Sequence, residues 1–113
     1  MNDKETPPEE MKLNGHPEFY NLLNKMAEIH SVKNHDYSEG QKDPLSNLRM
    51  CEGFGIPAWK GVLVRISDKF SRITQLSTKE AEVKDESFED TLLDMANYCL
   101  LCIILRRETN DKR

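Results

Sequence analysis

The segment from residue 92 to residue 105 constrains the fold more than any other part of this chain. Nearly every residue in it is apolar, so a helix formed here is apolar around most of its circumference and is normally buried in a core. Four polar residues interrupt this segment and the turns before it, at spacings of four, four and three: Glu86, Asp90, Asp94 and Asn97. Carboxylates in a core are costly unless they are paired with a cation or bound to a metal. The acidic stripe therefore predicts a functional site.

Helix signals also dominate the rest of the chain, and strand signals are scarce. Apolar residues recur every three or four positions in each long segment, which is the spacing of one helix face. We predict an all-α fold, a helical bundle with long helices over residues 17–34, 57–77 and 87–107 and a short helix over residues 44–52. The apolar faces are expected to fill the core. In the first helix that face is Phe19, Leu22, Leu23, Met26 and Ile29.

Turn residues and composition set the expected organisation. Residues 36–42 are predicted to form a loop, and Gly53 or Gly55 is predicted to end the short helix. We expect residues 1–14 to be a disordered leader, because they are acidic and lack the apolar core of a signal peptide. Residues 15–108 are expected to form one domain, and residues 109–113 to fray.

Net charge and hydropathy exclude some partners. The net charge of −4 gives no basic field for duplex nucleic acid, and no apolar run approaches the roughly 20 residues of a membrane span. The three cysteines are expected to stay reduced, which favours the cytoplasm. An acidic chain can still hold a nucleotide, because a divalent cation bridges carboxylates to phosphates.

The first group that carries chemistry is the acidic stripe itself. Asp90 and Asp94 are four residues apart, so their side chains are neighbours on a helix and can share a magnesium ion. An alternative for Asp90 is a capping box with Ser87, and Glu86 also suits the positive end of the helix dipole. Capping does not explain Asp94, which lies two turns into the helix between apolar neighbours.

The second group lies on the helix predicted over residues 57–77, where Arg65, Asp68, Lys69 and Arg72 share one face. On the functional interpretation, Asp68 joins the acidic stripe as a third metal ligand and the basic residues meet phosphates. On the alternative interpretation, these residues form a solvated face with ion pairs among themselves.

The third group follows the first predicted helix. Lys33, Asp36 and Tyr37 would lie in or beside a loop that closes over a ligand, with Lys33 on a phosphate and Tyr37 against a base. The alternative is a polar helix end, where Lys33 suits the dipole and Asp36 starts a turn.

Three blocks together, Lys33–Ser38, Arg65–Ile73 and Glu86–Tyr98, resemble the nucleotide-modification-associated domain family, small proteins common in bacteriophages. The match spans roughly residues 16–105. That family is similar to the all-α nucleoside triphosphate pyrophosphatases, the MazG-like and dimeric dUTPase group. The resemblance implies a MazG-like fold in which carboxylates of two helices hold magnesium and water attack releases pyrophosphate.

This chain departs from the signature of the pyrophosphatases, which is Glu-x-x-Glu on one helix and Glu-x-x-Asp on the next. Its first helix offers only Asp68, and its second offers Asp90 and Asp94, with Thr91 where a glutamate would stand. The carboxylate set is smaller, so the resemblance implies nucleotide binding more strongly than catalysis.

Three functions follow from these residues. The first is a magnesium-dependent pyrophosphohydrolase acting on a deoxynucleotide, modified or not. In it the three aspartates hold metal, the basic residues and Asn97 bind substrate, and Asp36 or Glu86 is the general base. The second is a phage protein that binds or sequesters a nucleotide or nucleotide-derived signal without cleaving it. The third is a helical assembly protein whose acidic stripe pairs with Arg65 and Arg72.

We also expect a homo-oligomer, most simply a dimer. The apolar surface of the last helix is larger than three short helices can cover.

Overall fold

A computed structural model describes residues 13–38, 43–78 and 88–111 of the chain. Within these ranges the regular structure is entirely helical, which confirms the predicted all-α class. The elements are α1 (Pro17–Ser38), the 3-10 helix η3 (Ser46–Phe54), α2 (Ala58–Thr78) and α3 (Phe88–Asp111). None of these helices combines the length and the hydropathy needed to cross a membrane.

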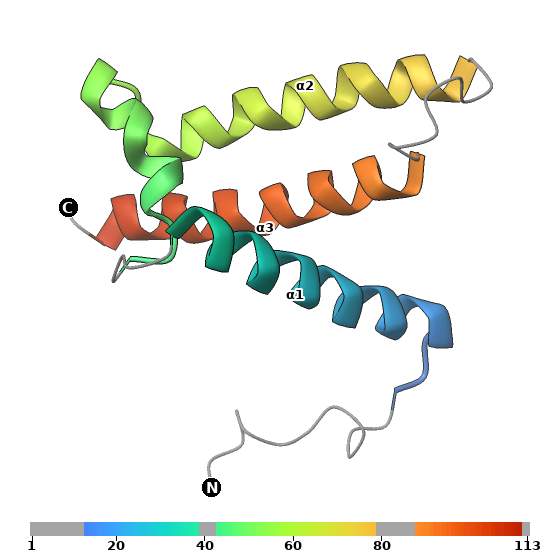
Figure 1. The fold of residues 1–113 in the computed structure, drawn as a ribbon. Coiled ribbons are helices and arrows are strands. Elements are labelled where there is room, and N and C mark those ends of the chain that lie inside the picture. The colour runs from blue at the N-terminus through green and yellow to red at the C-terminus, as the bar shows by residue number, and fades with distance from the viewer. Residues whose placement is uncertain (1–12, 39–42, 79–87, 112–113) are drawn as a thin grey trace, which may run out of the picture.

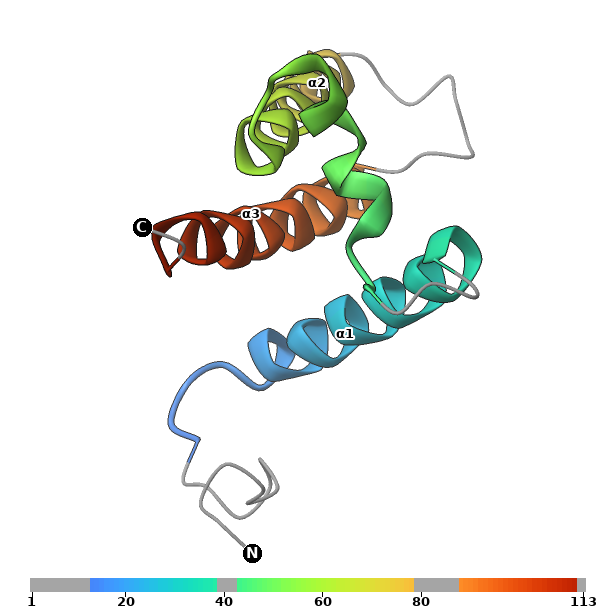
Figure 2. The same ribbon diagram turned by 90° about the vertical axis from the view of Figure 1, so that its left-hand side faces the viewer.

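Helix α3 is the central element of the bundle. It lies between α2 on one side and α1 on the other in both Figure 1 and Figure 2, and η3 runs across one end from the side of α1 to the start of α2. Because α3 faces both neighbours, its polar residues are the ones best placed to meet side chains from the other helices.

Three helix boundaries differ from those predicted. Helix α1 continues to Ser38, so the loop predicted from residue 36 is wrong at its start, and Asp36 and Tyr37 belong to the last turn of α1. The short helix is a 3-10 helix that starts at Ser46 rather than at residue 44. Helix α3 continues to Asp111, so residues 109–111 are helical. Most of the predicted leader lies outside the described residues.

The core sits where η3 and the first turns of α2 meet the second half of α3. Val62 and Leu105 are the most deeply buried large side chains, 1% and 2% exposed. The remaining members of this cluster are Leu45, Leu48 and Ala58, with Trp59, Ile66, Tyr98, Leu101 and Cys102 packed against it.

Two glycines shape the connection between η3 and α2. Gly55, one of the two glycines predicted to end η3, does so with φ of 79°, in the left-handed region that favours glycine. Gly61 lies where η3 crosses α2, and a Cβ atom there would come within 2.6 Å of the Cys51 sulfur. A side chain at position 61 would therefore have to displace the Cys51 sulfur from its place against α2.

Arg49 ties η3 to the end of α3. Its guanidinium bonds the carboxylate of Asp43 and lies 2.9 Å from that of Glu108. The hydrogen bond from Arg49 lowers the pKa of Asp43 below its usual value. These bonds fix η3 where Leu45 and Leu48 can reach α3.

The apolar face of α1 is not buried as predicted. Phe19, Leu22 and Leu23 are 59%, 37% and 43% exposed, because the packing of the bundle is concentrated between α2 and α3. The single chain therefore has a small core and much uncovered apolar surface.

Two valines on α2 test this description. Val62→Ala removes buried methyl groups and leaves a cavity, so it should lower the free energy of unfolding by about 2 kcal/mol. Val64→Ala shortens a side chain that is 61% exposed, so it should change the free energy of unfolding by less than about 0.5 kcal/mol. Equal effects in urea unfolding would contradict the placement of the core.

Candidate functional site

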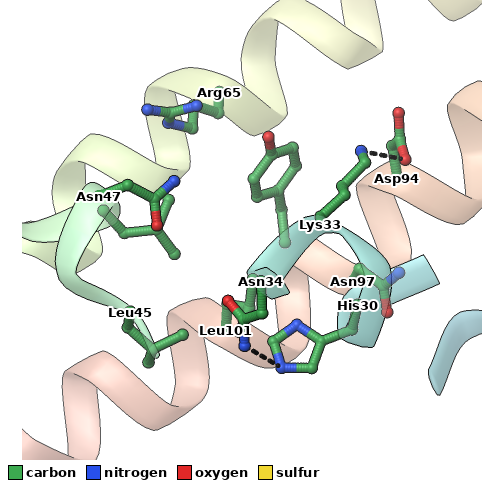
Figure 3. Close-up of a pocket in the computed structure, with 11 residues that line it drawn as sticks. His30, Lys33, Asn34, Leu45, Asn47, Arg65, Asp94, Asn97 and Leu101 are labelled. Atoms are coloured by element: carbon green, nitrogen blue, oxygen red, sulfur yellow. Dashed lines mark hydrogen bonds and ion pairs between the residues drawn. The ribbon is translucent and has the colours of Figure 1, made fainter. Parts of the chain in front are cut away.

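The candidate site is a cavity of about 340 Å³ between α1, η3, α2 and α3. Its walls combine charged, amide and apolar side chains from all four elements (Figure 3). The lining residues are His30, Lys33, Asn34, Leu45, Asn47, Leu48, Arg65, Asp94, Asn97, Tyr98 and Leu101.

Asp94 lies at the meeting point of the three long helices, where its carboxylate joins two lysines. Lys33 of α1 donates to one oxygen at 2.9 Å, and Lys69 of α2 lies 3.3 Å from the other. Figure 3 shows the Lys33 side chain reaching across to Asp94. The Asp94 side chain is only 20% exposed, so this pairing is less screened by water than a surface ion pair. The ion-pair alternative for Asp94 named Arg65 or Arg72, whereas the partners found are lysines.

Helix α2 adds a second hollow of about 260 Å³ beside the first. It is lined by Arg65, Asp68, Lys69, Arg72 and Tyr98. The four residues from α2 lie at spacings of three, one and three, so they share one face of the helix, as predicted. Arg65 and Tyr98 line both hollows, so the two lie side by side and are treated as one site. We call it the basic cleft.

The other end of the basic cleft is lined by imidazole, amide and apolar side chains. The amide of Asn34 and the ring of His30 are hydrogen-bonded at 3.2 Å, one turn apart on α1. Asn97 lines this end and donates from its amide to the Met26 carbonyl at 3.2 Å, a bond that holds α1 against α3. The ring of Tyr98 lies 6.0 Å from the Arg65 guanidinium, within the range of a cation–π contact.

The predicted metal ligands are distributed over different surroundings. Asp94 lies between two lysines, Asp68 lines the hollow on α2, and Asp90 is exposed in the first turn of α3. The described residues include no group of three or more His, Cys, Asp or Glu side chains that could hold a metal ion. The described part of the chain therefore offers no complete set of protein ligands for magnesium. The magnesium assignment stays a prediction.

Three predicted site residues cannot be placed in this cleft. Glu86 lies outside the described residues, and only the helical backbone of Asp36 and Tyr37 is described. Their predicted roles stay predictions.

Sequence reasoning missed part of the cavity wall. Lys33 and Asn34 follow His30 by three and four residues, so the three share one face of α1. Extending the helix face that begins at Phe19 by one more turn would have found them. Leu45, Asn47 and Leu48 carry no comparable signal, because their position depends on how η3 and the residue before it cross the bundle.

Comparison with known proteins gives one family. The family described as "Nucleotide modification associated domain 1" matches residues 33–105. This range is more than half of the chain and includes every residue that lines the basic cleft except His30. No curated protein and no solved structure matches the chain.

The lysine–aspartate–lysine bridge predicts a salt-dependent stability. Asp94→Asn leaves two ammonium groups close together without the carboxylate between them, so it should lower the free energy of unfolding by about 1–2 kcal/mol. Added salt screens the repulsion between the two ammonium groups. The decrease in the free energy of unfolding caused by Asp94→Asn, measured by urea unfolding, should therefore be smaller in 1 M than in 0.05 M sodium chloride.

The control for this substitution is Glu89→Gln. Glu89 pairs with Lys25 at 3.2 Å, but both side chains are well exposed, so the loss should stay below about 0.5 kcal/mol. A loss for Asp94→Asn no larger than that of the control would show that the bridge is not formed in solution.

Proposed function

We propose that this chain, which belongs to the nucleotide modification associated domain 1 family, binds a nucleotide in the basic cleft, with the phosphates at the end nearest α2. The observation that carries the proposal is the convergence of four basic side chains on one cleft in a chain whose net charge is −4. They are Lys33, Arg65, Lys69 and Arg72.

The charge balance of the cleft favours an anion. Among the described residues that line it, four side chains are basic and two are carboxylates, those of Asp68 and Asp94. Positive potential in a cleft with low-dielectric walls attracts anionic ligands and speeds their association. The chain as a whole is acidic, so the basic residues gathered in the cleft favour an anionic ligand at this place.

Asp94 prepares the lysines for this role. By bonding both ammonium groups, it holds Lys33 and Lys69 close together before a ligand arrives. An ammonium has three N–H donors, so it can bond Asp94 and a phosphate oxygen at once. The conformational entropy of the two long side chains is then lost when the chain folds, and it is not lost again when a ligand binds.

The end of the cleft lined by amide and apolar side chains suits a base and sugar. Asn34 and Asn47 carry amide donors and acceptors, and Leu45, Leu48 and Leu101 provide an apolar surface. A mostly apolar pocket with a few placed polar groups is the usual form of a small-molecule site. Tyr98 stands between the two ends, where its ring can pack against a sugar or base.

Two lysines of α2 test the proposal. Lys69→Met removes a cation of the cleft and should weaken the binding of nucleoside triphosphates by about 10- to 100-fold, the range expected for a hydrogen bond to a charged group. Lys60→Met removes a lysine that lies over the Trp59 ring, outside the cleft, and should leave binding unchanged. Isothermal titration calorimetry with a panel of nucleotides measures both.

Two outcomes would sink the proposal. One is the absence of binding by any nucleotide at millimolar concentration. The other is equal weakening by Lys69→Met and Lys60→Met, which would indicate general attraction of anions to the surface.

Release of pyrophosphate from a nucleoside triphosphate is a second candidate function, and the position of Asp68 favours it. Asp68 lines the same hollow as Lys69 and Arg72. Magnesium is commonly held by one or two carboxylates together with the phosphates of the substrate, so a magnesium–nucleotide complex does not need a complete set of protein ligands. This function would also agree with the proposed kinship to the MazG-like pyrophosphatases.

Incubation with nucleoside triphosphates and magnesium, followed by separation of the products, distinguishes the two functions. If the chain is a hydrolase, pyrophosphate appears, and Asp68→Asn stops its release while binding measured without magnesium persists. If the nucleotides stay intact although they bind, the chain is a binding protein.

A further inference from the structure

A hollow of about 570 Å³ lies between α2 and α3, apart from the basic cleft. Of the described residues, none lines both this hollow and the basic cleft. Ile103 of the hollow follows Asp94 of the cleft by nine residues, which places the two on opposite sides of α3 at 3.6 residues per turn. We call it the apolar hollow. What it binds is therefore independent of the nucleotide site.

The apolar hollow has one basic end. Helices α2 and α3 run in opposite directions (Figure 1), so the start of α2 lies beside the end of α3. There the guanidinium of Arg106 lies 4.3 Å from the centre of the Trp59 ring, and Arg107 also lines the hollow. Leu63 and Cys99 line it one to two turns farther along their helices. The other described lining residues are apolar side chains and thiols, so the charges are gathered at one end.

The two arginines have no counter-charge in the part of the chain that the structure describes. No carboxylate lines the hollow there, and neither Arg106 nor Arg107 forms an ion pair with a described residue. The Cys102 thiol donates to the Trp59 carbonyl at 3.5 Å, and burial raises the pKa of this thiol, so it stays neutral. A guanidinium presents paired N–H donors that match the two oxygens of a carboxylate. The basic end therefore suits a carboxylate.

The rest of the hollow is apolar surface that a ligand could cover. Leu63 and Ile103 are 46% and 48% exposed, while Trp59 and Ile66 are half-buried and pack against the core. Covering such surface is favourable, because it removes apolar area from water. Mostly apolar pockets of about 300–1,000 Å³ with a few placed charged groups are the usual form of small-molecule sites. The apolar hollow has this size and this composition.

The length of the hollow sets the length of the chain that it can hold. Arg106 and Cys99 are seven residues apart, which is about 10 Å along a helix. An extended chain advances by about 1.2 Å per bond, so about eight bonds span this distance. A linear chain of medium length therefore fits between the basic end and the far end of the hollow.

The shape of the hollow favours a free molecule over a membrane surface. Side chains that anchor a protein to a membrane enter the lipid from an exposed face. The Trp59 ring is instead half-buried, with Arg106 and Lys60 lying 4.3 and 5.4 Å from its centre, so it forms a wall of the hollow. Charges at one end and apolar surface at the other also match a ligand with one anionic head and one apolar tail.

We propose that the apolar hollow binds a fatty carboxylate of medium chain length, with about eight to ten carbons. The carboxylate bonds the guanidinium groups of Arg106 and Arg107. The chain lies along Leu63, Cys99 and Ile103. The ligand is a single free molecule, and its binding does not depend on what the basic cleft holds.

The fluorescence of Trp59 tests the proposal, because Trp59 is the only tryptophan of the chain and lines the hollow. Titration of the full chain with octanoate should change this fluorescence saturably. Octylammonium has the same chain and the opposite charge, and acetate has the same head and no chain, so each should bind at least about tenfold more weakly. From butanoate to octanoate, the affinity should rise about two- to fourfold per methylene, as expected for partly to fully buried methylenes.

A pair of neighbouring variants on α2 tests the apolar wall. Leu63→Asp places a carboxylate in the hollow and should weaken octanoate binding at least about tenfold. The matched control is Val64→Asp, which adds the same charge at a side chain that is 61% exposed and outside the hollow, so octanoate binding should be unchanged. Circular dichroism checks that both variants stay helical.

A second pair tests the basic end. Arg107→Gln removes a guanidinium and should weaken octanoate binding about tenfold, the range expected for a hydrogen bond between charged groups. Lys25→Gln removes the same charge from α1, outside the hollow, and should leave octanoate binding unchanged. Nucleotide binding should be the same in Arg107→Gln as in the parent, because Arg107 lies outside the basic cleft.

The proposal is overturned if octanoate at about 10 mM leaves the Trp59 fluorescence unchanged, since a complex with a dissociation constant of about 1 mM would then be mostly formed. It is also overturned if octylammonium binds as tightly as octanoate, or if Leu63→Asp binds octanoate as tightly as Val64→Asp. A response to phosphatidylglycerol vesicles without a response to octanoate would identify a membrane surface as the occupant and would equally overturn it.

Discussion

The arrangement of the basic cleft depends on one carboxylate. Asp94 binds Lys33 of α1 and Lys69 of α2, so a single side chain on the central helix connects all three long helices. A partly buried charge is stable only when it is paired, and here the pairing also brings two cations to the wall of a cavity. The same contact therefore holds the bundle together and shapes the proposed phosphate site.

A small core leaves α1 dependent on such polar contacts. The buried cluster lies between η3, α2 and α3, and no described side chain of α1 is fully buried. The polar bonds of α1 to α3 are the Lys33–Asp94 pair, the Asn97–Met26 bond and the exposed Lys25–Glu89 pair. An element that buries few side chains has a lower local stability than the core. Because α1 contributes Lys33, His30 and Asn34 to the cleft, a ligand that bonds these residues would also fasten α1 to the bundle.

The sequence predicted the helices and the polar faces because both are periodic patterns within single elements. The stripe that contains Asp94 and the face from Arg65 to Arg72 could be found in this way. The partners of Asp94 could not, since they depend on how three helices are placed in space. Periodicity also failed for Phe19 and Leu22, because an apolar face indicates that a surface needs covering and does not indicate whether the same chain covers it.

The central claim is that Lys33 and Lys69 form one phosphate site across Asp94, and NMR detection of lysine side-chain nitrogens tests it directly. Titration with a nucleoside triphosphate should shift the Nζ signals of Lys33 and Lys69 together, with one common dissociation constant, while that of Lys60 stays unchanged. Saturable nucleotide binding that leaves both signals in place, or shifts them no more than that of Lys60, would contradict the account.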